Sequence, residues 1–255
     1  MARYRVGCAG WAIPKAHTVE FPVEGSHLQR YAARFPAVEI NSSFYRPHQP
    51  ATYARWADSV PTGFRFSAKV PRAITHEQRL VAADVLLEVF VSEVTCLGSR
   101  LGCLLGQLPP SLAYDRSITE TFLADMRAHY DGPVVLEPRH PSWFTRSVAA
   151  QLHTYRVGRV AADPACVPAA AEPAGWPDLI YVRLHGSPDM YYSAYDERYL
   201  DHLAERMRVY ATRADEVWCI FDNTARFAAT PNAIGLASRL SLPSRAHRTP
   251  AYARW

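Results

Sequence analysis

Eight short runs of β-branched and aromatic residues recur along the chain, separated by longer segments in which apolar residues follow helical spacing. These runs are expected to be strands at residues 4–8, 38–41, 64–69, 101–107, 134–137, 159–163, 179–185 and 217–223. Successive runs begin about 30 residues apart on average, which is the size of one βα unit. Eight such units predict an α/β protein, a (β/α)₈ TIM-type barrel with a parallel sheet.

One of the eight units departs from the repeat. Residues 164–177 read PACVPAAAEPAGWP, and their four prolines exclude a regular α-helix because each lacks an amide hydrogen and clashes with the preceding turn. We expect a Pro/Ala-rich loop in place of the sixth crossover helix. Residues 1–242 are expected to form a single barrel domain, and residues 243–255 a basic and aromatic C-terminal arm.

The composition excludes several classes of protein. Hydrophobic residues make up 49% of the 255 residues and charged residues 20%, which excludes a mainly disordered chain. The formal net charge of +4 is too small to indicate a nucleic-acid partner by itself. The 5 cysteines are scattered without a C-x-x-C pair, and no apolar run reaches the about 18 residues of a membrane span. We expect a cytoplasmic protein without a membrane partner.

Alternation along the expected strands predicts which side chains face the barrel interior. Successive residues of a strand point to opposite faces, and we expect the apolar set to meet the helices. Active sites of parallel barrels lie at the carboxyl ends of the strands. The inward residues at those ends are polar on seven of the eight strands: Glu39, Asn41, Lys69, Gln107, Glu137, Arg139, Asp163, Arg183, His185 and Asn223. Because unpaired buried charges are costly, this array predicts a solvated functional pocket; mutual ion pairing within it is the structural alternative.

The residue types suggest roles within the array. Lys69 is one of only two lysines among 28 basic residues, which indicates that a compact ammonium is required at this position. Carboxyl, ammonium and imidazole groups transfer protons, so the predicted catalytic residues are Glu39, Lys69, Glu137 and His185. Amide, guanidinium and aromatic groups suit substrate or anion binding, and the residues predicted for it are Asn41, Tyr45, Gln107, Arg139, Trp143, Arg183 and Asn223.

Six motifs stand out: GCAGW at residues 7–11, VEINSSFYR at 38–46, KVPRAITH at 69–76, QLPPS at 107–111, EPRHPSW at 137–143 and RLHG at 183–186. In these motifs the chain closely resembles the YecE-like proteins, domain-of-unknown-function family 72. The resemblance implies a TIM-type barrel in a family whose reaction has not been settled. One departure is FDNT at residues 221–224, where relatives tend to show two adjacent asparagines and this chain has Asp222.

We therefore expect an enzyme that uses acid/base chemistry, such as hydrolysis, on a small phosphorylated or otherwise anionic molecule. The alternatives are a nucleic-acid-binding barrel, with or without metal-dependent phosphodiesterase activity, and a non-catalytic regulatory barrel. No cofactor is predicted, because the chain has neither a Walker-type loop nor G-x-G-x-x-G. A divalent metal stays an open alternative, with ligands drawn from Glu39, Glu137, Asp163, His185 and Asp222.

Overall fold

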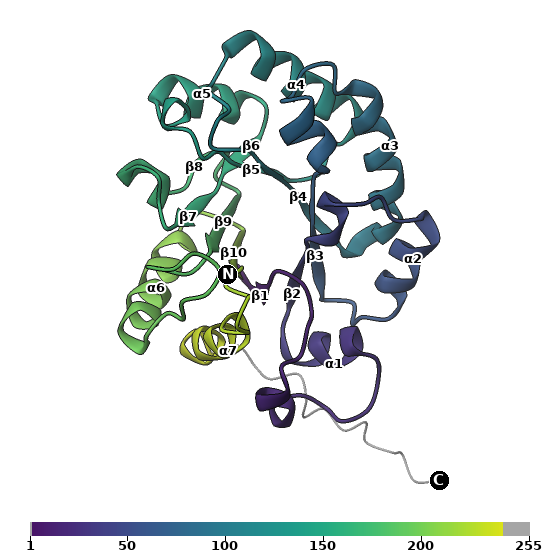
Figure 1. Ribbon diagram of the computed structural model, residues 1–255, viewed down its shortest axis with the longest axis vertical. Helices are drawn as coiled ribbons and strands as arrows, with labels where there is room; N and C mark the ends of the chain where they lie inside the picture. Colours follow the sequence, from purple (N-terminus) through teal and green to yellow (C-terminus); the bar gives the residue numbers. More distant parts are fainter. Residues whose placement is uncertain (1, 242–255) are drawn as a thin grey trace.

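The computed structural model describes residues 2–241, in which strands and α-helices alternate along most of the chain (Figure 1). The strands are β1 (Arg3–Cys8), β2 (Ala37–Ile40), β3 (Arg65–Lys69), β4 (Leu101–Gln107), β5 (Val134–Glu137), β6 (Val157–Arg159), β7 (Ala161–Asp163), β8 (Ala174–Gly175), β9 (Leu179–Leu184) and β10 (Glu216–Phe221). The helices are α1 (His27–Arg34), α2 (Pro50–Asp58), α3 (Asp84–Val94), α4 (Arg116–His129), α5 (Arg146–Thr154), α6 (Glu197–Tyr210) and α7 (Ala229–Arg239). The predicted C-terminal arm, residues 243–255, lies outside the described residues.

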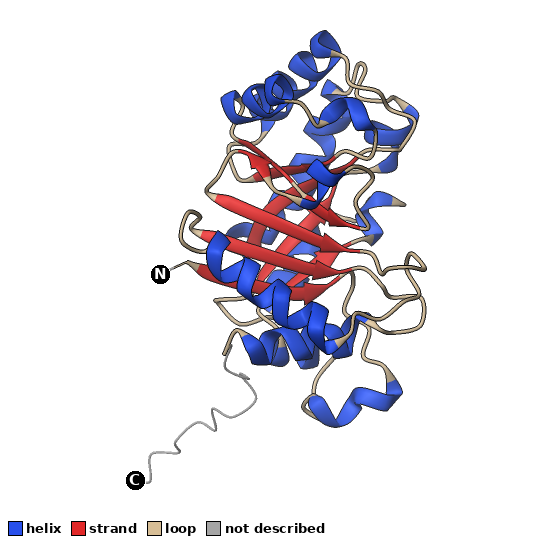
Figure 2. Ribbon diagram, turned by 90° about the vertical axis from the view of Figure 1, so that its left-hand side faces the viewer, coloured by secondary structure: helices blue, strands red, loops and turns tan. Residues whose placement is uncertain are grey.

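The strands form two sheets of mainly parallel neighbours. One sheet has the order β1–β10–β9–β7, and the other has the order β2–β3–β4–β5–β6–β8. Within the described part of the chain, β8 alone is antiparallel to its neighbour, β6. The helices lie outside the strands, and the arrows of the parallel strands point the same way (Figures 1 and 2). The prediction of an α/β protein with parallel strands is confirmed.

The hydrogen-bond ladder is interrupted between β1 and β2, where a tyrosine hydroxyl takes its place. A single isolated bridge joins Ala9 to Glu39 at the ends of these strands. The Tyr31 hydroxyl accepts a hydrogen bond from the Cys8 amide at 2.7 Å and donates one to the Ala37 carbonyl at 3.2 Å. Tyr31, on α1, therefore satisfies one backbone group on each strand.

A second interruption falls within the sixth predicted strand, which is divided into β6 and β7. β6 pairs with β5, whereas β7 pairs with β9. The segment predicted to lack the sixth helix holds only a 3₁₀ turn at Pro168–Ala171 and the short strand β8, so the replacement of that helix by a loop is confirmed. The structure thus shows two parallel sheets, and it does not show the continuous ladder of a closed barrel.

Apolar side chains pack on both faces of the strands. On β3, Phe66 and Ala68 belong to the core shared with the helices, as alternation predicts. The opposite faces of the strands form a second cluster, made of Ala37, Cys103, Leu105, Val135, Val160, Leu179, Tyr181, Trp218 and Ile220. On five of these strand segments, the residue two positions after a member of this second cluster is polar and buried. These residues are Glu39, Gln107, Glu137, Arg183 and Asp222. This face of the strands is therefore mainly apolar before the carboxyl ends of the strands, where it becomes charged.

Local signals determine where the helices begin. Ser26 caps α1 and forms a capping box with Gln29, while Asp115, Thr145 and Asp196 accept hydrogen bonds from the first turns of α4, α5 and α6. Each cap fixes the residue at which its helix begins. It therefore also fixes where the loop ends that leads from the preceding strand to that helix. None of the helices within residues 2–241 is both long enough and apolar enough to cross a membrane.

Candidate functional site

Arg183 lies at the centre of a buried charged cluster at the carboxyl ends of the strands. Its side chain is 0% exposed. Its Nε and Nη2 atoms donate to the two carboxylate oxygens of Glu39 at 3.0 and 2.7 Å. Nη1 donates to Glu137 at 3.0 Å, and Nη2 lies 2.9 Å from Asp222. All three guanidinium nitrogens thus face carboxylates of the protein itself, which fill the anion-binding role predicted for Arg183.

His185 connects two of these carboxylates. The Nε2 atom of its buried ring lies 2.8 Å from Oε1 of Glu137, and its Nδ1 atom lies 3.0 Å from Oδ2 of Asp222. A carboxylate only accepts, so both contacts are hydrogen bonds when the ring carries both protons. Nε2 also lies 3.2 Å from Nη2 of Arg139, which donates to the ring when Nε2 is unprotonated. The Nε2 atom therefore has a partner within the protein in either protonation state.

Opposite charges keep Glu137 and Asp222 ionised. Burial by itself would raise the pKa of both carboxyl groups. At Glu137 the charges of His185 and Arg183 outweigh burial and hold the pKa well below its usual range. At Asp222 the charge of Arg183 and the hydrogen bond from His185 likewise lower the pKa. Both side chains are therefore ionised at neutral pH and act as hydrogen-bond acceptors.

Lys69 ends β3 beside this cluster and differs from its arginines. Its side chain is buried, at 4% exposure, and forms no ion pair or hydrogen bond within residues 2–241. Its Nζ atom lies over the Phe44 ring, 4.2 Å from the centroid. Burial and the nearby charge of Arg183 lower the pKa of Lys69 to about 8. This ammonium therefore lacks the direct ion pair that each arginine of the cluster has, and the carboxylates of Glu39, Asp222 and Glu137 act on it only from a greater distance.

Three further predicted residues lie at the same end of the strands. Arg139, whose side chain is 20% exposed, donates from Nε to Glu137 at 3.1 Å. Gln107 donates to the same carboxylate at 3.5 Å. Asn41 directly follows β2, and its buried Oδ1 atom has no hydrogen-bond partner in the part of the chain that the structure describes. Arg139 and Asn41 therefore keep polar groups available to a ligand.

Two aromatic residues predicted to bind substrate do not join the cluster. Trp143 is fully buried in the core, and its indole donates to the Leu112 carbonyl at 2.9 Å. Tyr45 is 73% exposed and contacts the edge of Phe44. Both follow strand ends in sequence, but neither side chain contacts the charged side chains; in the loop after β2 it is Phe44, beside Tyr45, whose ring lies against Lys69.

The predicted inward position of Asn223 is wrong by one residue. Trp218 and Ile220 face the interior, so alternation also places Asp222 inward. Asn223 instead donates to Asn232 on α7 at 2.9 Å. β10 is apolar on both faces, and polarity along this strand therefore does not distinguish its inner face from its outer face.

The alternative of a divalent metal finds no matching geometry. Asp163, predicted to face inward, accepts instead from the Tyr195 hydroxyl at 2.7 Å, away from the cluster. Within residues 2–241, no group of three or more His, Cys, Asp and Glu side chains is arranged to hold a metal ion. The guanidinium groups of Arg183 and Arg139 lie against the carboxylates where such an ion would have to bind.

Two tyrosines outside the predicted site also contact the cluster. Tyr181 donates to Glu39 at 3.0 Å and bonds Ser67 at 2.8 Å. Tyr191, in the loop after β9, meets the His185 ring edge-on with centroids 5.8 Å apart. Alternation places Tyr181 inward, which is the signal that could have identified it. Tyr191 lies in a loop without periodicity, so only its position after a strand end marks it.

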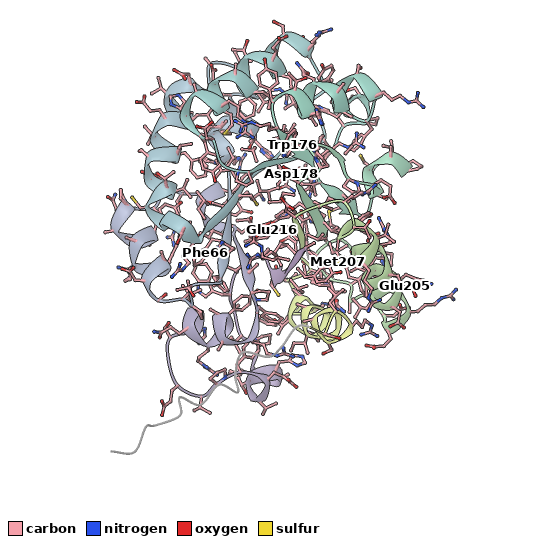
Figure 3. The ribbon with its side chains drawn as sticks, turned by 180° about the vertical axis from the view of Figure 1, so that it is seen from behind. Phe66, Trp176, Asp178, Glu205, Met207 and Glu216 are labelled. Atoms are coloured by element: carbon pink, nitrogen blue, oxygen red, sulfur yellow. The ribbon has the colours of Figure 1, made fainter. Side chains whose placement is uncertain are left out.

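The amino ends of the strands carry a separate cavity of about 440 Å³. Figure 3 shows three of its lining residues, Trp176, Asp178 and Glu216, from behind. Arginines and acidic residues balance in its lining: Arg3, Arg65, Arg127 and Arg156 against Asp131, Asp178, Asp215 and Glu216. Arg127 donates to backbone carbonyls, including that of Tyr155 at 2.7 Å. Such contacts to backbone carbonyls stabilise the loops at this end of the strands.

The described residues therefore define a class: an α/β protein with parallel sheets and a buried ionic cluster at the carboxyl ends of its strands. The chain belongs to the DUF72 family, because the model for "Protein of unknown function DUF72" matches residues 5–254. The resemblance to YecE-like proteins is thereby confirmed.

Individual relatives agree with this assignment. UPF0759 protein YecE of Escherichia coli (strain K12) is 30% identical over 172 residues, which cover 65% of this chain and 61% of YecE. UPF0759 protein YunF of Bacillus subtilis (strain 168) is 27% identical over 146 residues, or 55% of this chain and 52% of YunF. The chain thus matches less than two thirds of the length of either relative.

Solved structures of the family share the fold. A DUF72 family protein from Enterococcus faecalis V583 superposes with a TM-score of 0.80 at 22% identity, covering 94% of this chain and 96% of that one. A DUF72 family protein from Thermotoga maritima MSB8 gives a TM-score of 0.78 at 24% identity, with coverage of 94% and 99%. At these identities the similarity establishes the fold alone.

Proposed function

We propose that this protein binds a small anionic molecule, such as a phosphate ester, at the carboxyl ends of its strands and acts on it by acid/base catalysis. The observation that carries the proposal is the unpaired ammonium of Lys69. The carboxylates of the cluster are occupied by Arg183, Arg139 and His185, whereas Lys69 is buried without a counter-ion within residues 2–241. Burying an unpaired charge is costly, and a bound anion would remove that cost.

In this proposal the two sheets are arcs of one TIM-type barrel. Tyr31 bridges the seam between β1 and β2, and a single residue, Val160, separates β6 from β7 at the other seam. The cluster then lies at the mouth of the barrel, the end at which parallel barrels bind their substrates.

His185 is the proposed proton-transfer group. In a hydrolysis the imidazolium of His185, stabilised by Glu137 and Asp222, would protonate the oxygen of the leaving alcohol, and the attacking water would return a proton to the neutral ring. Arg139, which is partly exposed, would neutralise charge on the substrate. Glu39 is fully buried and both its oxygens accept from Arg183, so we assign it to positioning Arg183 rather than to proton transfer.

Thermal denaturation in rising inorganic phosphate, at constant ionic strength, tests the binding step. Saturable stabilisation is expected for the wild type, because a ligand that binds only the folded state raises its stability. Lys69→Met should weaken phosphate binding by at least about tenfold, the effect of losing a charged hydrogen bond. Lys15→Met, which removes the other, exposed lysine, is the matched control and should behave as wild type. Equal responses of the two variants would contradict the proposed role of Lys69.

Turnover is tested separately, by release of nitrophenolate from p-nitrophenyl phosphate. His185→Ala should abolish turnover while phosphate still stabilises the fold. Phosphate binding without wild-type turnover would refute the catalytic part and favour the regulatory alternative. Tight binding of a single-stranded oligonucleotide, with affinity falling steeply as salt rises, would instead favour the nucleic-acid alternative.

A further inference from the structure

A second imidazole, that of His76, lies beside the charged cluster in the loop that follows β3. One aromatic ring, that of Phe44, contacts both His76 and Lys69. The ring centroids of Phe44 and His76 are 5.0 Å apart with the rings nearly perpendicular, and the Lys69 Nζ atom lies 4.2 Å from the Phe44 centroid. His76 is partly exposed, unlike His185. Its ring can therefore contact water or a ligand next to Lys69.

The hydrogen bonds around His76 fix which ring nitrogen carries the proton. Thr75, its neighbour on the π-helical turn Ala73–Glu77, donates its hydroxyl hydrogen to the Pro71 carbonyl at 3.3 Å. The same oxygen lies 2.9 Å from Nδ1 of His76. A hydroxyl has only one hydrogen, so in the neutral ring Nδ1 carries the proton and donates to Thr75. Nε2 then holds a free lone pair, is not buried, and has no hydrogen-bond partner among the described residues.

His76 and His185 have opposite electrostatic surroundings. Both ring nitrogens of His185 face carboxylates, which favour the charged ring. His76 instead has one acidic neighbour, the exposed Glu77, and three cationic ones, which are Lys69, Arg72 and Arg139. Burial and these positive charges lower the pKa of His76 from its usual value of 6.5, so the ring is neutral at neutral pH. Two imidazoles whose surroundings favour opposite protonation states are suited to the acid and base roles of one reaction.

The two imidazoles also approach the mouth from different sheets. His76 follows β3, and His185 follows β9 in the other sheet. Ser67 of β3 bonds Tyr181 of β9 at 2.8 Å, so these strands face each other across the interior (Figure 1). In phosphoryl transfer the attacking and leaving oxygens lie roughly in line on opposite sides of phosphorus. A base from one sheet and an acid from the other match that requirement.

We propose that His76 is the general base of the hydrolysis in which His185 is the acid. His76 adds to the function proposed above, on which its role rests, the group that first receives the proton of the attacking water. Nε2 of His76 takes this proton as the water oxygen bonds to phosphorus. The bond from phosphorus to the alcohol oxygen breaks, its electron pair stays on that oxygen, and the imidazolium of His185 supplies the proton that completes the alcohol. The proton on His76 then returns through water to His185, which restores the starting state.

Nitrogen NMR of protein labelled with ¹⁵N-histidine tests the state of His76 without turnover. At neutral pH the His76 signals, identified by their absence in His76→Gln, should be those of a neutral ring protonated at Nδ1. Thr75→Val keeps the shape of the side chain but removes the hydroxyl, so it should shift the balance toward protonation at Nε2. A charged ring or protonation at Nε2 in the wild type, or a tautomer unmoved by Thr75→Val, would overturn the proposal.

Hydrolysis of p-nitrophenyl phosphate tests the role itself. His76→Gln should lower kcat by at least about 100-fold, the lower end of general acid–base contributions, with KM and thermal stabilisation by phosphate unchanged. His48→Gln is the matched control and should turn over as wild type. His48 is also a partly exposed loop histidine whose pKa is lowered by burial, but its ring contacts Tyr53 and Trp56 rather than the cluster.

The pH profile separates a base from a residue that only supports the fold. As pH falls below 6.5, His76 gains a proton and loses its lone pair, so wild-type kcat/KM should fall along a limb that His76→Gln lacks. Wild-type turnover that survives in His76→Gln, or that keeps this limb there, would overturn the role of His76 and leave the proposed function intact. Loss of phosphate binding in His76→Gln would also overturn it, because a base acts on the reaction and not on binding. Absence of wild-type turnover would refute both.

Discussion

Replacing Arg183 with methionine should lower the free energy of unfolding by about 3–5 kcal/mol. The substitution keeps an unbranched side chain but removes every contact to the three surrounding carboxylates. Two of these keep partners within the cluster, whereas Glu39 keeps only the Tyr181 hydroxyl. The change therefore leaves one fully buried carboxylate without a counter-ion, and loss of one partner of a buried pair costs about that amount. For a chain of this size, the melting temperature should fall by about 6–20 °C.

Urea denaturation followed by tryptophan fluorescence at neutral pH measures this loss. Arg198→Met is the matched control, because Arg198 is exposed on α6 and has no ion pair within residues 2–241. The double variant Arg183→Met, Glu39→Gln should recover at least half of the loss, since it replaces the unpaired carboxylate with a neutral amide. A loss below about 1 kcal/mol, typical of a surface pair, would refute the reasoning. A double variant less stable than Arg183→Met would do the same.

Three further predictions concern stability and reactivity. The pKa values of Glu137 and Asp222 are lowered on folding, so their stabilisation is present above the unfolded-state values and is lost as pH falls through the folded-state values. Stability to urea should decline below about pH 4, and an equally steep decline in Glu137→Gln would contradict this origin. Tyr31→Phe leaves an amide on β1 and a carbonyl on β2 unpaired and should cost about 1–3 kcal/mol by the same assay, whereas unchanged stability would show that the bridge is dispensable. Acylation of Lys69, followed by mass spectrometry with the chain's other lysine as reference, should stop accelerating above the pKa of about 8, and a rate still rising near pH 10, as for an ordinary lysine, would be inconsistent with the buried amine.

The positions of the strands could be predicted from the sequence because strand signals are local. The predicted runs 101–107 and 134–137 coincide with β4 and β5, and three others, which became β1, β3 and β9, differ by one residue at one end. The division of the sixth strand into β6 and β7 was not predictable, because it depends on which neighbour each part pairs with. Strand β8 is similarly defined by its pairing with β6, in a segment whose prolines indicate only a loop.

The candidate site was predicted in part. Alternation places Glu39, Lys69, Glu137 and Arg183 on one face, because each stands on a strand whose opposite face is clearly apolar. It fails at Asn223, on a strand that is apolar on both faces. It also gives no information on Trp143, since the direction of a side chain after the strand depends on how the loop packs.

The sequence by itself determined where most strands lie along the chain and that no α-helix follows the sixth strand. It also determined which kinds of side chain gather at the carboxyl ends of the strands. Only the tertiary structure decided which charges pair. Arg183 bonds Glu39 across 144 positions of sequence and Glu137 across 46, and these contacts leave Lys69 without a counter-ion among the described residues. A hydrogen bond needs its atoms within about 3 Å, and sheet register and side-chain packing, which bring distant segments together, determine that distance.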